Sequence, residues 1–421
     1  MKFASKANSP GLRLIAEIAI CHLISTHCSF PFGHMRMPNL TRRSTSTPTP
    51  PTTLCVVLPT WVGDACMATP TLRALRTSFP DCKIVGVMRP VIHDVLEQAW
   101  GTDRAWIDEA ILFNKKGGDR AESRWGLIRQ IRHSGAKLAV LLTNSLWSAA
   151  VVRLARVPRV VGYDRDARGV FLSDRVPVPR DGRRLRPISP VDYYLNLADW
   201  LGCDTHSDGA AIRAMQLGVT PADEFMAQRL WKLAGFSTDR PIVAINSGSA
   251  TQAARLWPVE HVQELAQRLA GEFNLQVLLH CGPVEREACN AIAARLSNPR
   301  VVSMGIAEQL PIGLSKAVLK RSDVVVSTDS GPRHLAVALN RPVVTLFGPT
   351  SPEWTQTYNH PESILSAHGD CSDGSPARRS PENQYCMRDI SVDRVMAAVA
   401  SIISPTTGLR PSREVGYRSA I

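Results

Sequence analysis

The sequence predicts an α/β protein built from two successive βαβ domains. The chain has 421 residues, which is too long for one compact core and sufficient for two domains. From Leu54 onward, short apolar runs alternate with amphipathic runs, the pattern of a parallel sheet covered by helices. A polar stretch with scattered Gly and Asp, residues 202–221, interrupts this alternation once. We therefore expect two domains of similar size that face each other across a cleft.

The apolar and amphipathic runs place the elements of each half. In the first half we expect strands at 54–58, 83–87, 138–142 and 160–162, and helices at 69–78, 124–134, 145–155 and 191–201. A helix at 222–234 then leads into strands at 242–246, 276–280, 301–303, 324–327 and 343–347, with helices at 259–272, 284–296, 310–320 and 331–339. A last helix, 392–403, follows an irregular polar loop at 367–388.

The ends of the chain differ from its body. Residues 44–53, STSTPTPPTT, have the composition of a linker. The segment 11–25 is apolar but too short to span a bilayer and is interrupted by Glu17. It can be read as part of a mis-started or disordered extension, or as a weak membrane-surface anchor. The predicted divisions are an extension and linker at 1–53, domains at 54–220 and 221–390, a C-terminal helix at 391–403 that could pack back on the first domain, and a flexible tail at 404–421.

Charge and cysteine content narrow the functional class. The chain carries 49 Lys and Arg against 37 Asp and Glu, and much of this excess lies in the two ends. The remaining bias suits an anionic substrate or a membrane surface and does not require nucleic acid. The ten cysteines include no CxxC pair, and Cys55 and Cys281 lie in apolar runs. We therefore expect reduced thiols, no structural zinc site and a cytoplasmic protein.

The first strand–helix junction offers a candidate base. It reads LPTWVGDACMATPTLR, in which Gly63 permits a tight turn and Asp64 follows directly after a buried strand. A carboxylate at the carboxyl end of a parallel strand faces the ligand cleft and can act as a general base. Asp64 could instead serve only as a helix cap.

Two stretches in the second half have the composition of an anion site. Residues 242–258 run from a buried strand into Ser247, Gly248 and Ser249, and then reach Arg255 before Trp-Pro. Small residues let backbone N–H groups approach an anion, and an arginine neutralises it. The segment GPVERE follows the next strand, and its Glu285 and Glu287 could hold ribose hydroxyls or merely cap a helix.

The stretch STDSGPRH at 327–334 is the strongest candidate for phosphate binding. A strand leads into Asp329, Ser330 and Gly331, and a proline stands at the first helical turn. Free amides and the positive end of the helix dipole favour an anion here. His334 lies one turn into this helix, and Asp329 could bond a ligand hydroxyl or act as a cap.

Several other motifs are absent or weak. The chain has no GxGxxG after a strand and no GxxxxGK[ST], which disfavours dinucleotide dehydrogenases and P-loop enzymes. Asp164-Arg165-Asp166 is formally a DxD, but it is flanked by arginines and reads as a solvated loop, so we expect no metal.

The segments TWVGDACMATPTLRALR, the strand ending at Trp257-Pro258, and STDSGPRHLAVALNRPVVTLFGPTSPEWT together resemble the ADP-heptose:lipopolysaccharide heptosyltransferases of glycosyltransferase family nine. The segment 144–169 supports the branch of the second heptosyltransferase. The resemblance spans about residues 54–403. It implies a GT-B fold, in which two Rossmann-like domains face each other and the nucleotide sugar lies mainly on the second.

The resemblance also implies roles for individual residues. Asp64 matches the catalytic carboxylate, and Arg255 stands where the family usually has a lysine. Ser330, Gly331 and His334 fall on the diphosphate-binding helix start, and Asp329 on a sugar-hydroxyl contact. Only Cys371 and Cys386 remain of the cysteines that the family often has before its last helix.

The expected activity is inverting transfer of heptose from ADP-L-glycero-β-D-manno-heptose to the inner core of lipopolysaccharide, without cofactor or metal. The acceptor would dock on the first domain, near the basic residues Arg168, Arg183 and Arg184, although such a run is often only a solvated loop. Loose attachment to the cytoplasmic face of the inner membrane is compatible with the charge. Two alternatives remain: another nucleotide sugar as donor, or a catalytically silent nucleotide-sugar binding module.

Overall fold

The computed structural model describes residues 50–97, 105–114, 124–182, 184–207, 209–248, 255–348, 350–367 and 385–407. The predicted extension lies outside these residues up to position 49, as does the tail from 408. Ser249, Arg183 and Cys371 also lie outside them, and the side chain of Cys386 is not described.

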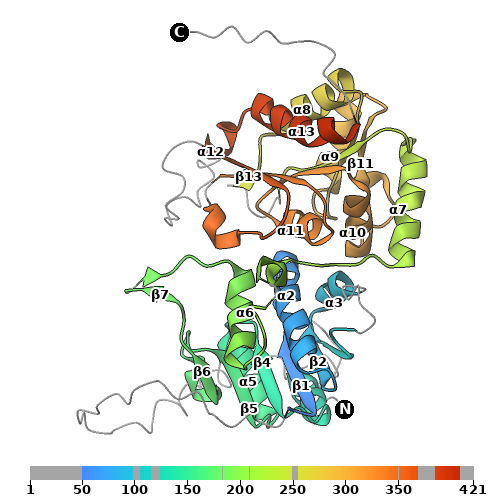
Figure 1. The fold of residues 1–421 in the computed structure, drawn as a ribbon. Coiled ribbons are helices and arrows are strands. Elements are labelled where there is room, and N and C mark those ends of the chain that lie inside the picture. Colours follow the sequence, from blue (N-terminus) through green and yellow to red (C-terminus); the bar gives the residue numbers. More distant parts are fainter. Residues whose placement is uncertain are drawn as a thin grey trace, which may run out of the picture. The chain divides into compact units, whose positions relative to one another are not determined.

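The first half contains a parallel sheet of six strands in the order β3-β2-β1-β4-β5-β6 (Figure 1). This is the strand order of a Rossmann-like sheet, in which the order reverses between β1 and β4 and leaves a ligand crevice at the carboxyl ends. The strands are β1 (Thr53–Val57), β2 (Lys83–Met88), β3 (Glu109–Leu112), β4 (Leu138–Leu141), β5 (Arg159–Tyr163) and β6 (Asp174–Val176).

Helices cover both faces of this sheet because its central strands are apolar on both sides. Leu54 and Val56 of β1 share one core cluster with residues of α2 and α6, whereas Cys55 and Val57 share the other with α4 and α5. Such continuous burial is typical of strands in a parallel sheet. The helices are α2 (Val62–Ser78), α3 (Pro90–Leu96), α4 (Arg124–His133), α5 (Leu146–Leu154) and α6 (Pro190–Trp200).

The predicted start of the first helix was wrong. We expected it at residue 69, with Pro70 in the first turn, but α2 begins at Val62 and contains Pro70 in its interior. A proline there has no N–H for the carbonyl four residues earlier, which is that of Cys66. The hydroxyl of Thr69 donates to this carbonyl at 2.7 Å, so the acceptor is still satisfied. The early start places Asp64 within the first turn of the helix rather than on a loop.

The second half repeats the design with a parallel sheet in the order β11-β10-β9-β12-β13-β14. Its strands are β9 (Ile242–Asn246), β10 (Gln276–Leu279), β11 (Val301–Ser303), β12 (Val324–Thr328), β13 (Val343–Phe347) and β14 (Glu362–Ser366). Its helices are α7 (Pro221–Ala234), α8 (Val259–Glu272), α9 (Arg286–Leu296), α10 (Ile312–Arg321), α11 (Gly331–Ala338), α12 (Tyr385–Arg388) and α13 (Val392–Thr407). The two sheets confirm the predicted α/β class.

The C-terminal helix α13 packs against α8 and against strands β12, β13 and β14. The sequence left open whether this helix packs back on the first domain. In the structure its contacts are with the second half instead, because its buried residues Val395 and Val399 complete the core above that sheet. Short elements at the edges, β3, β6, β14 and α3, were not predicted.

The two halves contact each other within one compact unit, Pro50–Ile421. Helix α2 packs against α11, and α10 packs against α3. The fully buried Lys316 on α10 donates from Nζ to the carbonyl oxygens of Val95 at 3.3 Å and Glu97 at 3.1 Å, at the C-terminal end of α3. Burial lowers the pKa of this lysine.

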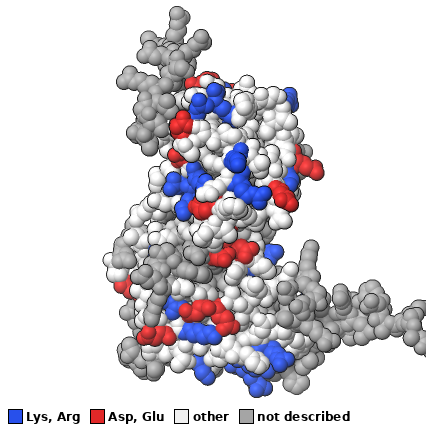
Figure 2. All heavy atoms as spheres, turned by 90° about the vertical axis from the view of Figure 1, so that its right-hand side faces the viewer, with Lys and Arg blue, Asp and Glu red and all other residues white. Residues whose placement is uncertain are grey.

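No helix in the described part of the chain is long and apolar enough to cross a membrane. Charge is mixed over most of the face shown in Figure 2, where basic and acidic side chains are interspersed.

Candidate active site

Asp64 lies at the start of α2, directly beyond the carboxyl end of β1. Its carboxylate is partly buried, and among the described residues no hydrogen bond or ion pair satisfies it. Burial raises its pKa to about 6, because desolvation disfavours the charged form. A carboxylate with a raised pKa and no partner is suited to accept a proton from a ligand.

The N-terminal ends of α2 and α11 meet at this point. A Cβ atom built on Gly63 would lie 2.8 Å from Cδ2 of His334, and one built on Gly331 would lie 3.6 Å from Cβ of Val62. The absent side chain of Gly63 thus allows the backbone of α2 to pack on the imidazole. Two positive helix ends therefore converge beside Asp64, an arrangement that favours an anion.

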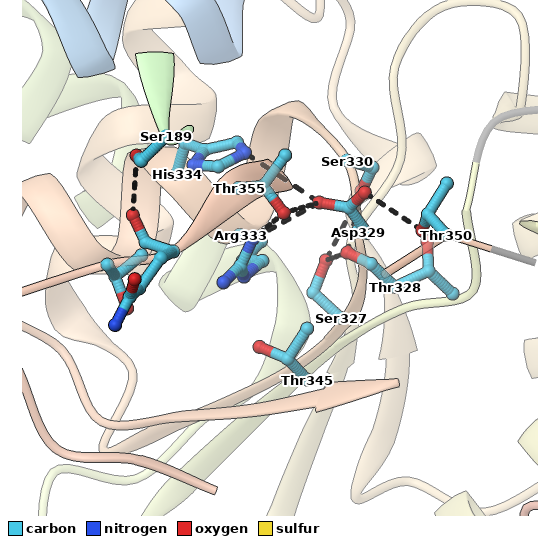
Figure 3. Close-up of polar contacts among 12 residues, drawn as sticks. Ser189, Ser327, Thr328, Asp329, Ser330, Arg333, His334, Thr345, Thr350 and Thr355 are labelled. Carbon is cyan, nitrogen blue, oxygen red and sulfur yellow. Dashed lines mark hydrogen bonds and ion pairs between the residues drawn. The ribbon is translucent and has the colours of Figure 1, made fainter. Parts of the chain in front are cut away.

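Asp329 follows β12 and is almost completely buried. Its carboxylate accepts hydrogen bonds from Arg333 Nη1 at 3.1 Å, Thr355 Oγ1 at 3.0 Å and Thr350 Oγ1 at 3.2 Å. Figure 3 shows these three side chains converging on it from different segments. This carboxylate is largely occupied by protein donors, so its main observed role is to hold the loop after β12 and the loop containing Thr355 together.

Arg333, which the sequence did not identify as a site residue, links this network to β14. Its guanidinium is fully buried, bonds Glu362 through Nε at 2.7 Å and stacks 4.9 Å from the ring centroid of Phe347. Burial alone would raise the pKa of Glu362. Its hydrogen bonds with Arg333 and with the hydroxyls of Thr345 and Thr357 have the larger effect, so the pKa of Glu362 is lowered.

The second and third predicted stretches lie side by side. The side-chain oxygen of Asn246 accepts hydrogen bonds from the backbone N–H of Gly248 at 3.2 Å and from Ser330 Oγ at 3.4 Å. Gly248 has a φ of 110°, and a Cβ there would lie 3.0 Å from Thr328 Oγ1. Ser247 accepts the N–H of Trp257 at 3.0 Å through its carbonyl. Asn246, another residue that the sequence did not single out, thus fixes the small-residue loop against the start of α11.

Arg255 reaches the same place from the segment before α8. Its Nη1 donates to the backbone carbonyl of Asp329 at 2.9 Å and lies 3.6 Å from a carboxylate oxygen of that residue. About a third of the side chain, 33%, is exposed. The arginine is therefore held at the start of α11 while keeping donors available to a ligand.

Two buried polar atoms in this cluster have no hydrogen-bond partner among the described residues: Thr328 Oγ1 and His334 Nδ1. Buried polar groups are rarely left unpaired, and those that are call for an explanation. Burial and the nearby Arg333 lower the pKa of His334 to about 4, so the imidazole is neutral at pH 7. A neutral imidazole and a hydroxyl are free to bond a ligand without adding charge.

The segment after β10 joins this cluster through His280, whose carbonyl oxygen accepts a hydrogen bond from Asn246 Nδ2 at 3.4 Å. Glu285 precedes α9 and accepts the N–H of Gly282 at 3.2 Å, which closes the turn. Glu287 is exposed in the first turn of α9. Among the described residues, no hydrogen bond or ion pair joins Glu287 to Asp329, Ser330 or His334.

The predicted acceptor arginines have unlike surroundings. Arg168 is fully buried and donates to the carbonyl oxygens of Tyr163, at 2.8 Å, and Thr143, so it braces the loop after β5. Arg184 is exposed on β8 (Arg184–Leu185), which pairs with β7 (Arg180–Asp181). In the DxD stretch, Asp166 pairs with Arg165 at 3.1 Å.

A cavity of about 490 Å³ opens beside α6. It is lined from the first half by Arg186, Ser189 and Asp192, and from the second by Glu353 and Tyr358. Ser189 Oγ donates to the carbonyl of Gln356 at 2.8 Å across this boundary. The cavity offers polar side chains of both charges.

Two Rossmann-like halves with a carboxylate and an anion site between them are the architecture expected of a GT-B protein. The family description "Glycosyltransferase family 9 (heptosyltransferase)" matches residues 124–383, more than half of the chain, and the chain belongs to this family.

Relatives and solved structures agree with this membership. The chain is 26% identical to lipopolysaccharide heptosyltransferase 2 of Salmonella typhimurium over 83% of its own length and 98% of the relative's. It superimposes on the glycosyltransferase family 9 protein from Veillonella parvula with a TM-score of 0.68 at 20% identity, covering 84% of this chain and 97% of that one. The TM-score with ADP-heptose LPS heptosyltransferase II of E. coli is 0.65 at 24% identity, with 84% and 99% covered. These likenesses confirm the predicted GT-B fold.

Proposed function

We propose that this chain transfers heptose from ADP-L-glycero-β-D-manno-heptose to the inner core of lipopolysaccharide, with inversion at the anomeric carbon. The observation that carries the proposal is that the first turn of α2, which holds Asp64, packs against the start of α11, where Arg255 and His334 lie. Among the described residues neither the Asp64 carboxylate nor His334 Nδ1 has a hydrogen-bond partner. A base and an anion site in contact are what transfer from a nucleoside diphosphate sugar requires. Family 9 membership and the named relatives support heptose as the sugar.

In the proposed reaction Asp64 removes the proton from an acceptor hydroxyl. The acceptor oxygen then forms a bond to the anomeric carbon on the face opposite the diphosphate, and the bond from that carbon to the β-phosphate oxygen breaks. The proton stays on Asp64, and ADP leaves with the bonding electrons. The raised pKa of Asp64, about 6, still leaves most of it ionised at pH 7.5.

The leaving diphosphate would be stabilised by the second half of the molecule. The amides at Ser330 and Gly331 and the Arg255 guanidinium supply positive charge and donors without a metal ion. The small-residue loop at Ser247 and Gly248 leaves room for the diphosphate to approach them. Loss of one such preorganised donor typically costs about 2.7–4 kcal/mol of barrier. In this proposal Glu285 and Glu287 hold the ribose. Asp329 positions the loops around the sugar, in addition to any hydrogen bond with a sugar hydroxyl.

The acceptor would approach from the side of the first half. We place it at the cavity beside α6, where Arg186 lies two residues after Arg184. Basic side chains there suit the anionic groups of an inner core. We infer a cytoplasmic protein with loose attachment to the inner membrane, since its acceptor is carried by a lipid.

The test is ADP release with ADP-heptose and a heptose-terminated inner-core acceptor, comparing the wild type with Asp64→Asn. General base catalysis contributes about 10²–10⁴-fold, so the variant should lose at least 100-fold in kcat while donor affinity is unchanged. Equal turnover by both proteins would remove Asp64 from the mechanism. Release of ADP or UDP from a different sugar alone would shift the donor assignment, and donor binding without any turnover would favour a silent binding module.

A further inference from the structure

The outer layer of the first half, formed by α4 and α5, differs in charge from the rest of the molecule. Residues 124–163 contain seven Lys and Arg and no Asp or Glu. The whole chain has 49 basic and 37 acidic residues, so an acid-free run of this length departs from its ordinary mixture. The basic residues are Arg124, Arg129, Arg132, Lys137, Arg153, Arg156 and Arg159.

The fold gathers these cations on one face. The apolar residues of α4 and α5, including Leu127, Ile131 and Val152, are buried against the first sheet, so the remaining sides of both helices face outward. Arg132 Nη2 donates to the carbonyl of Leu154 at 2.8 Å, which joins the C-terminal ends of the two helices. We call this outward side the α4–α5 face.

The cations of this face are largely uncompensated. Among the described residues, only Arg159 of the seven pairs with a carboxylate, that of Asp174 at 3.1 Å. Arg129, Arg153 and Arg156 are exposed. Such a single-signed surface attracts a polyanion over about a Debye length, roughly 8–10 Å at physiological salt.

Large apolar side chains stand among the cations. Trp125 is 77% exposed on α4, and it precedes Arg129 by four residues and Arg132 by seven, which places all three on one side of the helix. Leu154 is 53% exposed beside Arg153. Tryptophan is enriched where proteins meet the headgroup region of a bilayer, because its ring is apolar and its N–H is polar.

We propose that the α4–α5 face docks on an anionic phospholipid bilayer. The Lys and Arg side chains are attracted to the anionic headgroups, and Trp125 and Leu154 enter the headgroup layer. Neither helix can insert, since its apolar side is already buried in the core, so the attachment is superficial and sensitive to salt. This inference rests on the proposed function, which includes loose membrane attachment, and assigns the surface that makes it; the face contains none of the residues assigned to donor or base.

The test is sedimentation of the full chain with vesicles, in the absence of donor and acceptor. We compare phosphatidylcholine vesicles with vesicles that also contain phosphatidylglycerol, for the wild type, for R129E/R153E/R156E, and for a control, R229E/K232E/R295E. The control changes the net charge equally but alters exposed cations of α7 and α9. Thermal unfolding verifies that each variant is folded.

We expect binding only to the anionic vesicles, a loss of at least tenfold in R129E/R153E/R156E, and a change of less than threefold in the control. Trp125→Ala should weaken binding by a smaller factor than the triple variant. Equal binding to neutral vesicles, or no binding by the wild type, would overturn the proposal. Unchanged binding by the triple variant would also overturn it and would assign attachment to another segment, such as residues 11–25.

Discussion

Asp64 and Asp329 lie near the carboxyl ends of two sheets that have the same strand order, yet their surroundings are opposite. Asp64 has no partner among the described residues, and its pKa is raised by burial. Asp329 is bonded by Arg333, Thr350 and Thr355. The position of a carboxylate in a repeated fold therefore does not determine its role. The donors around it decide whether it reacts or holds the structure.

The largest effect is expected from removing Arg333, which tests whether the Asp329 network holds the structure together. Arg333→Met keeps much of the side-chain length but leaves Glu362 buried without its cation and Asp329 with only Arg255, at 3.6 Å. Breaking a buried pair in this manner costs about 3–5 kcal/mol. Urea unfolding should show a loss of this size in the free energy of unfolding.

The matched control is Arg268→Met. Arg268 also pairs with three carboxylates, those of Glu264, Glu272 and Asp393, but at the surface. Exposed pairs contribute about 0–1 kcal/mol, so the control should lose little. If both variants lost the same amount, burial would not be what makes the Asp329 network important.

A smaller effect is expected where the two regions touch. In Gly63→Ala the new methyl group would lie 2.8 Å from His334 Cδ2, so the imidazole or the start of α2 must move. Overpacking of this kind typically costs about 1–3 kcal/mol. In the control Gly271→Ala nothing lies within 4 Å, and helix propensity should stabilise the protein by up to about 1 kcal/mol. The free energy of unfolding should therefore fall in Gly63→Ala and rise in Gly271→Ala. A rise in Gly63→Ala would refute the close packing between Gly63 and His334.

The smallest effect concerns the stability contribution of Asp64. Because its pKa is raised to about 6, its ionised form destabilises the folded state, and this penalty develops as pH rises through that value. Asp64→Asn should therefore be more stable than the wild type at pH 7.5. A shift of roughly two pKa units corresponds to at most ~3 kcal/mol, and the partial exposure of the carboxylate reduces this figure. The difference should vanish below about pH 4, where both side chains are neutral. A variant less stable than the wild type at pH 7.5 would show that Asp64 has a stabilising partner.

The central elements were predictable because their sequence pattern is strong. The central strands β9 and β13, and the edge strand β11, have the predicted bounds, since each is a short and mainly apolar run between turn signals. The edge strands β3, β6 and β14 were missed because they are short and only partly buried, so apolar residues do not mark them. Helix α2 was predicted too short because a proline normally indicates a first turn, and the hydroxyl that compensates for Pro70 is a tertiary detail.

The sequence predicted which loops form the candidate site, but not the side-chain contacts within it. The stretches containing Asp64, Arg255 and Ser330 do come together, since each follows a strand of a parallel sheet. The partner of Arg333 was not predictable, because Glu362 lies 29 residues away on an unpredicted edge strand. The burial of Arg168 was not predictable either, since the sequence does not show which of the arginines near the predicted acceptor site has a buried side chain.

Lys316 has a consequence for the modularity of this fold. Because the two halves have the same strand order and each has its own sheet, chimeric enzymes could in principle be made by exchanging one half between homologous proteins. The buried ammonium group on α10 depends on the carbonyl oxygens that end α3, so it makes each half incomplete without a matching partner. A recombinant whose first half ends α3 differently would leave this buried ammonium group without both carbonyl acceptors, with Asp223 Oδ2 at 3.9 Å as its remaining partner among the described residues. Exchange boundaries must therefore keep α3 and α10 from the same parent.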